Sequence, residues 1–450
     1  MTEMTINQIA AQRVGGGIEA ATRAALDTVA DETTIFAKVE AEDALAQARA
    51  LDARNAEAPV GPLHGVTLAH KDMYDRAGRV TGFGAHPDAG QMAGETATVL
   101  KRLDAAGQVD LGRLRMSEFA MGPTGHNHHW GIPRNTARPG AISGGSSSGS
   151  GAAVGAGLVR AALGSDTGGS IRLPAACNGV VGFKPTQGRV PITGVMPLSH
   201  TQDTVGPLAA TVAEARLVLS VISGPDGTDP ACRDVAVPRL NGQALPTTLK
   251  VGFGVGAYAS DASAAMLAQI EMLRSGMSET GIATVDVDTD MFGTLHEAAN
   301  VIAMSEAAAV HCDRLALTPE TYGEQLRTRL SQALAINGAA YVRSRQIRAL
   351  ARKEVRDRIF SQVDLLILPT LPDVPPMEET MNVKGDPNFA HLIGSLVRFT
   401  RPINLLGLPA LSVPLVKGGP EGPLSVQVIG PEWSEDLIAD LGEWIESARG

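Results

Sequence analysis

Residues 163–175 read LGSDTGGSIRLPA, in which a short apolar strand runs into a Gly-Gly turn and a serine follows at once. Successive glycines allow backbone N–H groups to point toward one centre and to form a nest that holds an oxyanion. Ser170 is delivered beside this nest, where a nucleophile for acyl transfer has to lie. A tight turn without a catalytic role fits the same residues, so the turn alone leaves both interpretations open.

A nucleophilic serine needs a base to activate it. His200 and His311 have no distinctive context, and His391 opens an ordinary amphipathic stretch. The alternative is Lys71, at the end of a short apolar strand within residues 65–72, GVTLAHKD. A lysine at the end of a buried strand is desolvated, which disfavours the charged amine and lowers its pKa. A neutral Lys71 can accept a proton directly or through another hydroxyl group.

A second glycine–serine segment, GGSSSGSG, occupies residues 144–151. It lacks the Gly-Lys-Ser/Thr ending of a P-loop, and strand and helix patterns flank it too closely for a flexible linker. Residues 145–149 match the nucleophile elbow G-x-S-x-G with Ser147 at the centre, but residues 139–143, PGAIS, are a poor version of the strand that an elbow requires. The segment by itself therefore identifies no nucleophile.

Together these segments resemble the amidase-signature family. The resemblance rests on residues 144–149 and 164–175, on GVVGFKPT at 179–186, and on the position of the lysine within residues 65–72. Shorter matching motifs are EFAMG at 118–122, DTVGP at 203–207, LPT at 368–370 and NLLGLPA at 404–410. The match spans about residues 15 to 440. It implies a three-layer α/β fold with a large mixed central β-sheet covered by helices on both faces.

The resemblance also implies a role for each catalytic position. Ser170 matches the nucleophile, Lys71 matches the base, and Ser146 matches the bridging serine, which in this family is associated with a cis peptide bond. Ser147 and Ser148 are then structural. The backbone N–H groups that match the oxyanion hole are those of Thr167, Gly168, Gly169 and Ser170.

Three variable segments are expected to supply the substrate pocket, as they do in this family. They are residues 119–124, the helix at 299–311 and the Pro-rich loop at 373–386. Within the first segment, the pocket candidates are Phe119, Met121 and Gly122.

The chain departs from the family pattern at three positions without losing a catalytic group. Thr67 replaces a frequent proline, Ser148 replaces a common glycine, and His70 replaces the apolar residue before the lysine. Because side chains alternate along a strand, His70 is expected to face away from Lys71.

The remaining chain alternates helices and strands, which is typical of one α/β domain over residues 1–450. A helical N-terminal region is expected over residues 1–55 and the signature core over about 62–210, and the remainder completes the sheet and the pocket. Helices are predicted at 18–28, 41–54, 96–107, 152–158, 212–222, 261–281 and 339–361, and strands at 109–112, 159–163, 180–183, 249–253 and 363–368.

Composition narrows the partners and the compartment. The net charge of −10 repels phosphate backbones, so nucleic acid is not an expected partner. The seven arginines and lysines of residues 339–361 are interpreted as the solvated face of an amphipathic helix. Three scattered cysteines fit a reducing compartment. Residues 1–12 show no signal-peptide pattern and no run of 18 apolar residues occurs, so we expect a cytoplasmic protein that does not enter membranes.

A histidine cluster, HNHH at residues 126–129, raises the question of a bound metal. The spacing of His126, His128 and His129 matches no helical ligand pattern, and the nearest carboxylate in sequence is the more distant Glu118. We interpret these histidines as loop residues, and we expect neither a metal nor a cofactor.

Three classes of function are weighed. The first is a stand-alone amidase that hydrolyses the C–N bond of a small amide. The second is the amidotransferase subunit that supplies ammonia for charging tRNA with glutamine, which shares these motifs but requires an ammonia channel and a second protein chain as partner. The third, a catalytically silent binding protein, would have lost one of Lys71, Ser146 and Ser170. We favour the first, with a small amide as partner; its identity and homodimer formation are left open.

Overall fold

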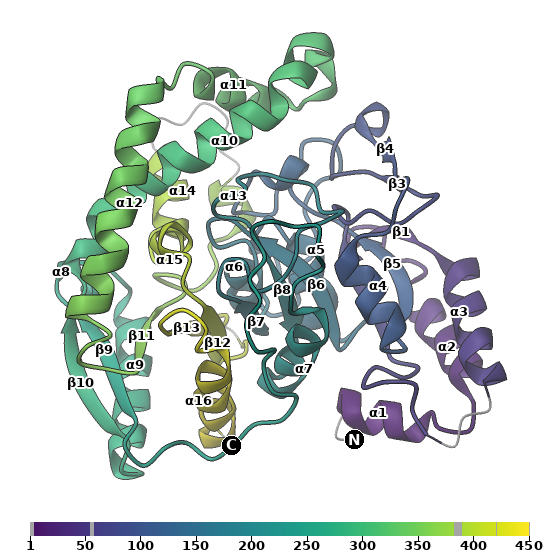
Figure 1. Ribbon diagram of the computed structural model, residues 1–450, viewed down its shortest axis with the longest axis horizontal. Coiled ribbons are helices and arrows are strands. Elements are labelled where there is room, and N and C mark those ends of the chain that lie inside the picture. Colours follow the sequence, from purple (N-terminus) through teal and green to yellow (C-terminus); the bar gives the residue numbers. More distant parts are fainter. Residues whose placement is uncertain (1–3, 55–57, 382–388, 420, 450) are drawn as a thin grey trace.

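The computed structural model describes residues 4–54, 58–381, 389–419 and 421–449. Among these residues, eleven strands form one mixed sheet (Figure 1). The strands are, in spatial order, β1 (Phe36–Val39), β5 (Val109–Leu114), β2 (Thr67–Lys71), β6 (Ala161–Asp166), β8 (Thr204–Ala209), β7 (Val181–Lys184), β12 (Ala410–Val416), β13 (Leu424–Ile429), β11 (Leu365–Pro369), β9 (Lys250–Val255) and β10 (Ala283–Asp288). The expected α/β class with a large mixed sheet is confirmed.

The direction of the strands decides where the candidate residues meet. Strand β2 runs parallel to its neighbours β5 and β6, whereas β8, β7, β12 and β13 continue the sheet in antiparallel pairs. The carboxyl ends of parallel neighbours lie at the same edge of a sheet. The end of β2, which carries Lys71, and the end of β6, which leads into the Gly-Gly turn, therefore emerge side by side. A separate two-stranded sheet contains β3 (Val80–Thr81) and β4 (Gln91–Met92).

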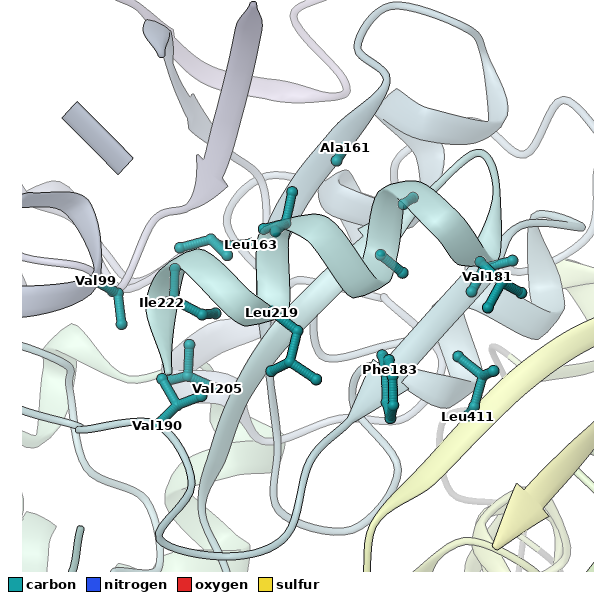
Figure 2. Packing of buried hydrophobic residues seen from close by; sticks show 14 of the residues in the cluster. Val99, Ala161, Leu163, Val181, Phe183, Val190, Val205, Leu219, Ile222 and Leu411 are labelled. Atoms are coloured by element: carbon teal, nitrogen blue, oxygen red, sulfur yellow. The ribbon is translucent and has the colours of Figure 1, made fainter. Parts of the chain in front are cut away.

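Helices cover both faces of the half of the sheet around β6. Successive side chains of β6 enter different apolar clusters: Ala161 and Leu163 join one cluster and Ala162 joins the other, as alternation along a strand requires. Leu219 and Ile222 pack into the first cluster (Figure 2). The first face is covered by α4 (Thr98–Ala105), α7 (Val212–Ile222) and α16 (Glu435–Ala448), and the second by α2 (Ile18–Val29), α3 (Ala41–Ala53) and α5 (Ser148–Gly155).

A second group of helices packs beside the other half of the sheet, at the left of Figure 1. Strands β11 and β13 share an apolar cluster with α8 (Ala257–Ser260), α10 (Leu295–Leu317), α12 (Gly338–Arg358) and α15 (Arg401–Leu406). The remaining helices are α1 (Ile6–Gln12), α6 (Arg172–Cys177), α9 (Ala264–Glu279), α11 (Glu324–Ala333), α13 (Glu378–Met381) and α14 (Phe389–Val397), with single 3₁₀ turns η1 (Pro87–Ala89), η2 (Glu118–Ala120), η3 (Asp290–Thr294) and η4 (Pro319–Thr321). None of the described helices is both long and apolar enough to cross a membrane.

The amphipathic interpretation of the basic helix is confirmed. Helix α12 exposes all of its basic side chains except Arg348, which is buried and donates to Gln187 Oε1 (2.5 Å). Among its exposed cations, Arg352 pairs with Glu432 and Arg358 with Glu354.

Three predictions about local structure need correction. The N-terminal region is not purely helical, because residues 36–39 form the edge strand β1, paired antiparallel with β5. Helix α5 begins at Ser148 rather than at residue 152. Its first residues are small and buried, and they pack closely against the neighbouring chain: a Cβ atom on Gly149 would lie 2.6 Å from Arg115 N. In the expected loop at 373–386, residues 378–381 form α13, and residues 382–386 lie outside the described part of the chain.

Candidate active site

Lys71 lies at the centre of a hydrogen-bonded group of hydroxyls. It ends β2 and is completely buried. Its Nζ donates to Ser146 Oγ (2.7 Å) and to Ser165 Oγ (2.8 Å). The structure thus brings together two of the predicted residues, 75 positions apart in sequence. Ser165 was not singled out by the sequence, because only the pairing of β2 with β6 reveals that it faces the lysine.

The environment of Lys71 favours a neutral amine. Burial lowers its pKa from the ordinary value of a lysine to about 7, while the negative charges of Asp203 and Asp166 oppose this shift. At neutral pH a large fraction of Lys71 is therefore unprotonated and has a lone pair that accepts a proton.

Ser146 follows a cis peptide bond between Gly145 and Ser146, and it is completely buried. Its carbonyl oxygen accepts a hydrogen bond from the N–H of Ser117 (3.0 Å). The next residue, Ser147, is fastened to strand β6 instead: its Oγ accepts from Ser165 N (3.2 Å) and donates to Ser165 O (3.2 Å). These contacts match the structural role expected for Ser147.

Ser170 is half-buried and lies in the turn after β6. Its carbonyl oxygen accepts from Ser147 N (3.3 Å), so the two serine segments are adjacent. The carboxylate of Asp166 organises the turn by accepting from Gly169 N (2.7 Å) and Ile171 N (3.2 Å). The N–H of Gly169, expected in the oxyanion hole, is thus already engaged within the turn.

The second glycine of the Gly-Gly pair is required by both conformation and space. Gly169 has φ +128°, which L side chains rarely adopt, and a Cβ atom there would lie 2.3 Å from Thr400 Oγ1. Thr400 Oγ1 also donates to the carbonyl oxygen of Gly168 (2.8 Å). The residue that fixes the turn from outside comes from the distant segment before α15.

A buried ion pair between Arg172 and Asp166 stabilises the serine turn. Arg172 Nε donates to Asp166 Oδ2 (3.0 Å), and both side chains are completely buried. The guanidinium also donates to Asn404 Oδ1 (2.6 Å) and Gln427 Oε1 (2.8 Å). Burial alone would raise the pKa of Asp166, but the charge of Arg172 and the hydrogen bonds that Asp166 accepts from Arg172 and Asn404 hold it well below its usual range. The sequence places both residues in the motif without indicating this supporting role.

Replacing Arg172 by methionine is expected to lower the free energy of unfolding by about 3–5 kcal/mol, because it leaves the Asp166 carboxylate buried without its cation. Thermal or denaturant unfolding measures the change. Arg352→Met is the matched control, since Arg352 and its partner Glu432 are exposed, and such pairs contribute less than about 1 kcal/mol. Equal stability losses in the two variants would contradict the supporting role of Arg172.

A cavity of about 1210 Å³ lies near the serine turn. None of Lys71, Ser146 and Ser170 lines it, but Arg401 does, and a Cβ atom on Gly168 would lie 3.6 Å from Arg401 Nε. Residues 121–124 form part of its wall, and Gly145 N donates to Pro123 O (2.8 Å), which ties this wall to the Ser146 segment. The predicted pocket segments contribute as follows: Met121 and Gly122 from the first, Asn300 and Met304 from α10, and Glu378 and Met381 from α13 all line the cavity.

Phe119, the third pocket candidate, does not line the cavity, so its prediction needs correction. Its backbone is left-handed (φ 45°), and its buried ring packs in the core against Phe83, His311 and Tyr322 instead of lining the cavity. A non-glycine residue gives no sequence signal of positive φ, so the direction of this side chain was not predictable.

The histidines that the sequence left open have local partners. His129 Nε2 lies 3.0 Å from Glu118 Oε1, and Glu118 also accepts from Gly323 N (3.0 Å), so this pair joins two walls of the cavity. His126 and His128 line the cavity. His70 is buried next to Asp110 (3.4 Å) and edge-on to Tyr74, away from the hydroxyls around Lys71.

Comparison with known proteins identifies the class of this fold and site. The family model for Amidase matches residues 20–438. A glutamyl-tRNA(Gln) amidotransferase subunit from Synechococcus sp. (strain RCC307) is 35% identical, covering 93% of this chain and 90% of the relative. AtzE of Pseudomonas sp. (strain ADP), which is named as a 1-carboxybiuret hydrolase subunit, is also 35% identical, with 90% and 89% covered.

Solved structures agree with these relatives. A chain solved as part of a vestigial protein complex, described as revealing the evolutionary origins of an s-triazine catabolic enzyme, superimposes with a TM-score of 0.87. It shares 32% identity, and 98% of this chain and 97% of that chain are covered. The protein is therefore a hydrolase acting on carbon–nitrogen bonds. It belongs to the Amidase family, the amidase-signature enzymes, as the resemblance in its motifs implied.

Proposed function

We propose that this chain hydrolyses the amide bond of a small substrate through an acyl-enzyme on Ser170, with Ser146 and Lys71 relaying the proton. The observation that carries the proposal is the buried lysine, with a pKa of about 7, within 2.7 Å of a serine hydroxyl. A fully charged lysine could not act as a base, and a fully exposed one would be charged at neutral pH.

The first half of the reaction forms the acyl-enzyme. In neutral Lys71 the lone pair replaces one N–H and accepts the proton of Ser146 across the 2.7 Å contact. Ser146 takes the proton of Ser170 as Ser170 Oγ attacks the amide carbonyl. We assign the oxyanion hole to the N–H groups of Thr167, Gly168 and Ser170, because Gly169 N already donates to Asp166. Each such donor stabilises the transition state by about 3 kcal/mol.

The second half releases the products. The proton held by Lys71 returns through Ser146 to the leaving nitrogen, the C–N bond breaks, and ammonia or an amine departs. A water molecule, deprotonated by the same relay, then attacks the acyl carbonyl and frees Ser170. Every step uses side chains and backbone groups of this chain, so no cofactor is required in the proposal.

Asp203 provides a test of the lysine base through pH. Its carboxylate accepts from Thr167 Oγ1 (2.5 Å), and its negative charge raises the pKa of Lys71. Removing that charge in Asp203→Asn lowers the pKa of Lys71 further, so the acidic limb of the kcat/KM profile should move to lower pH. The profile of the variant against the wild type measures the shift. If the acidic limb moved to higher pH or stayed in place, the assignment of Lys71 as the base would be contradicted.

The proposed role is that of a stand-alone amidase working as one domain in the cytoplasm. The relatives support a second candidate role, since one is named as an amidotransferase subunit and another as a hydrolase subunit. Purified alone, the chain should release ammonia from amides at the same rate per active site as it does in a cell extract. Activity that appears only with a co-purifying protein would favour the amidotransferase role.

A further inference from the structure

A tight turn at residues 199–203 precedes β8 and is fastened to helix α10. Glu306 of α10 is buried, and its carboxylate accepts a hydrogen bond from Ser199 Oγ (2.6 Å). The same carboxylate accepts from the N–H (3.2 Å) and from the hydroxyl (2.9 Å) of Thr201. From the side of α12, Tyr341 donates its hydroxyl to Glu306 Oε1 (2.8 Å). One side chain therefore joins this turn to two helices.

Helix α10 borders the large cavity as well as this turn. Asn300 and Met304 of α10 line the cavity. Ala299 O, next to Asn300, accepts from the side-chain amide of Gln202 (3.0 Å), and Gln202 is buried. The turn is thus attached to α10 at two places about two helical turns apart, which fixes it relative to the wall of the cavity.

Asp203 connects this turn to the proposed oxyanion hole. Its Oδ2 accepts from the N–H groups of Leu198 (2.8 Å) and Ser199 (2.9 Å), so the backbone of the turn sets the direction of the carboxylate. Its Oδ1 accepts from the hydroxyl of Thr167 (2.5 Å), a residue whose N–H we assign to the oxyanion hole. Burial lowers the pKa of Lys71 to about 7, and the charge of Asp203 opposes this shift. The position of the turn therefore affects both the oxyanion hole and the proposed base.

The groups around Glu306 keep its carboxylate charged. Burial alone would raise the pKa of Glu306, but the hydrogen bonds that it accepts from the turn and from α12 lower it. His200 Nδ1 lies 3.6 Å from Oε2 and Arg345 Nη1 lies 3.9 Å from Oε1, and both of these side chains are exposed. On α12, the charge of Glu306 opposes the burial that lowers the pKa of Arg348. The neighbouring anion is Asp203, whose pKa burial raises to about 6, so both carboxylates are charged at neutral pH.

We infer that Glu306 is a positioning residue for amide hydrolysis, which holds the 199–203 turn on α10 and thereby keeps the Asp203 carboxylate against the hydroxyl of Thr167. The inference rests on the proposed function and adds to it a residue that does not itself contact the reacting groups. Hydrogen bonds to a charged carboxylate are about twice as strong as neutral ones, so Glu306 is a firm anchor for the turn. Such an anchor matters because catalytic groups have to be held within about 0.5 Å of their productive positions.

The test follows the labelling of Ser170 by a fluorophosphonate in the full chain, at pH values from about 5 to 9. Glu306→Asp keeps the charge but shortens the side chain by one methylene, and Ser199→Ala removes one donor of the turn. Glu306→Asp should lower the labelling rate at alkaline pH by about tenfold or more, because a displacement of about 1 Å near the reacting atoms costs up to about 10²-fold. Ser199→Ala should lower it in the same direction.

The pH profile separates positioning from a general loss of structure. When the turn is released, the charge of Asp203 supports the protonated form of Lys71 less, the pKa of Lys71 falls, and the acidic limb moves to lower pH. Asp166, the other carboxylate whose charge acts on Lys71, stays paired with Arg172. In an Asp203→Asn background, Glu306→Asp should move the limb no further, because the charge that it displaces is already gone.

Glu214→Asp is the matched control. Glu214 of α7 is also buried, and it accepts from Arg160 Nε (2.9 Å) and from Ile6 N (3.0 Å). Arg160 directly precedes β6, at the end of that strand opposite to the serine turn, so Glu214 lies away from the proposed site. Glu214→Asp should lower the thermal midpoint of unfolding, as Glu306→Asp does, without moving the acidic limb or changing the labelling rate.

The inference and the proposed function fail in different ways. If the wild type is not labelled at Ser170, the proposed function is wrong and the inference fails with it. If the wild type is labelled with an acidic limb near pH 7 and both variants keep its rate and its limb, the inference alone is overturned. A slower rate with the limb in place or at higher pH would assign Glu306 a structural role only and would also overturn it. Should Glu306→Asp not fold, Ser199→Ala decides by the same two readouts.

Discussion

Ser170→Ala is expected to lower kcat/KM for amide hydrolysis by about 10⁴-fold or more, since removal of a nucleophile leaves only the contribution of the oxyanion hole and of binding. The same variant should no longer react with fluorophosphonates. The side chain is half-buried in a turn held by backbone hydrogen bonds to Asp166, so its removal should leave the fold intact. Steady-state kinetics and an unchanged thermal midpoint check both parts.

Ser147→Ala is the matched control for this prediction. Ser147 stands at the centre of the formal G-x-S-x-G match, but its hydroxyl is bonded to the backbone of Ser165. Its removal should reduce kcat/KM by less than about tenfold, through local loosening of β6. A larger loss for Ser147→Ala than for Ser170→Ala would exchange the roles of the two serines.

The second large effect concerns Lys71. Lys71→Met should lower kcat by about 10³-fold or more, because the variant removes the proton acceptor for Ser146, and general-base catalysis contributes about 10²–10⁴-fold. In the wild type, activity should fall as pH drops through about 7, where Lys71 becomes protonated. The residual activity of the variant should lose this acidic limb.

A second buried lysine offers the control. Burial also lowers the pKa of Lys184 to about 7, but its Nζ donates to Pro185 O rather than to a serine. Lys184→Met is expected to reduce stability while the acidic limb of the profile stays near pH 7. If the acidic limb disappeared in Lys184→Met and persisted in Lys71→Met, the base would be Lys184 and the assignment of Lys71 would be wrong.

The motifs predicted the centre of the site better than its surroundings. Lys71 and Ser146 belong to continuous motifs. Strand β2 carries Lys71 beside β6, and the bonds of Ser147 to Ser165 hold the Ser146 segment against β6. The inward direction of Phe119 depends on a left-handed backbone that a phenylalanine does not announce. Arg329 and Arg401 lie on separate helices, so only the tertiary fold shows that they share a cavity.

Long helices such as α7 and α9 were predicted from periodicity, and the large mixed sheet was implied by the resemblance to the amidase-signature family. Strand β1 and the start of α5 were not predicted. Strand β1 has only four residues and is defined by its pairing with β5. Helix α5 has no polar face, because it is buried on all sides, so the period that predicts a surface helix is missing. Both elements owe their structure to neighbours that are distant in sequence.

Covalent labelling tests the central claim most directly. The purified chain is treated with a fluorophosphonate, and the modified residue is located by mass spectrometry of its peptides. The proposed mechanism predicts one adduct on Ser170, formed faster as pH rises through about 7 and strongly slowed in Lys71→Met. An adduct on Ser146 or Ser147, or labelling of Ser170 at the same rate in Lys71→Met, would contradict it.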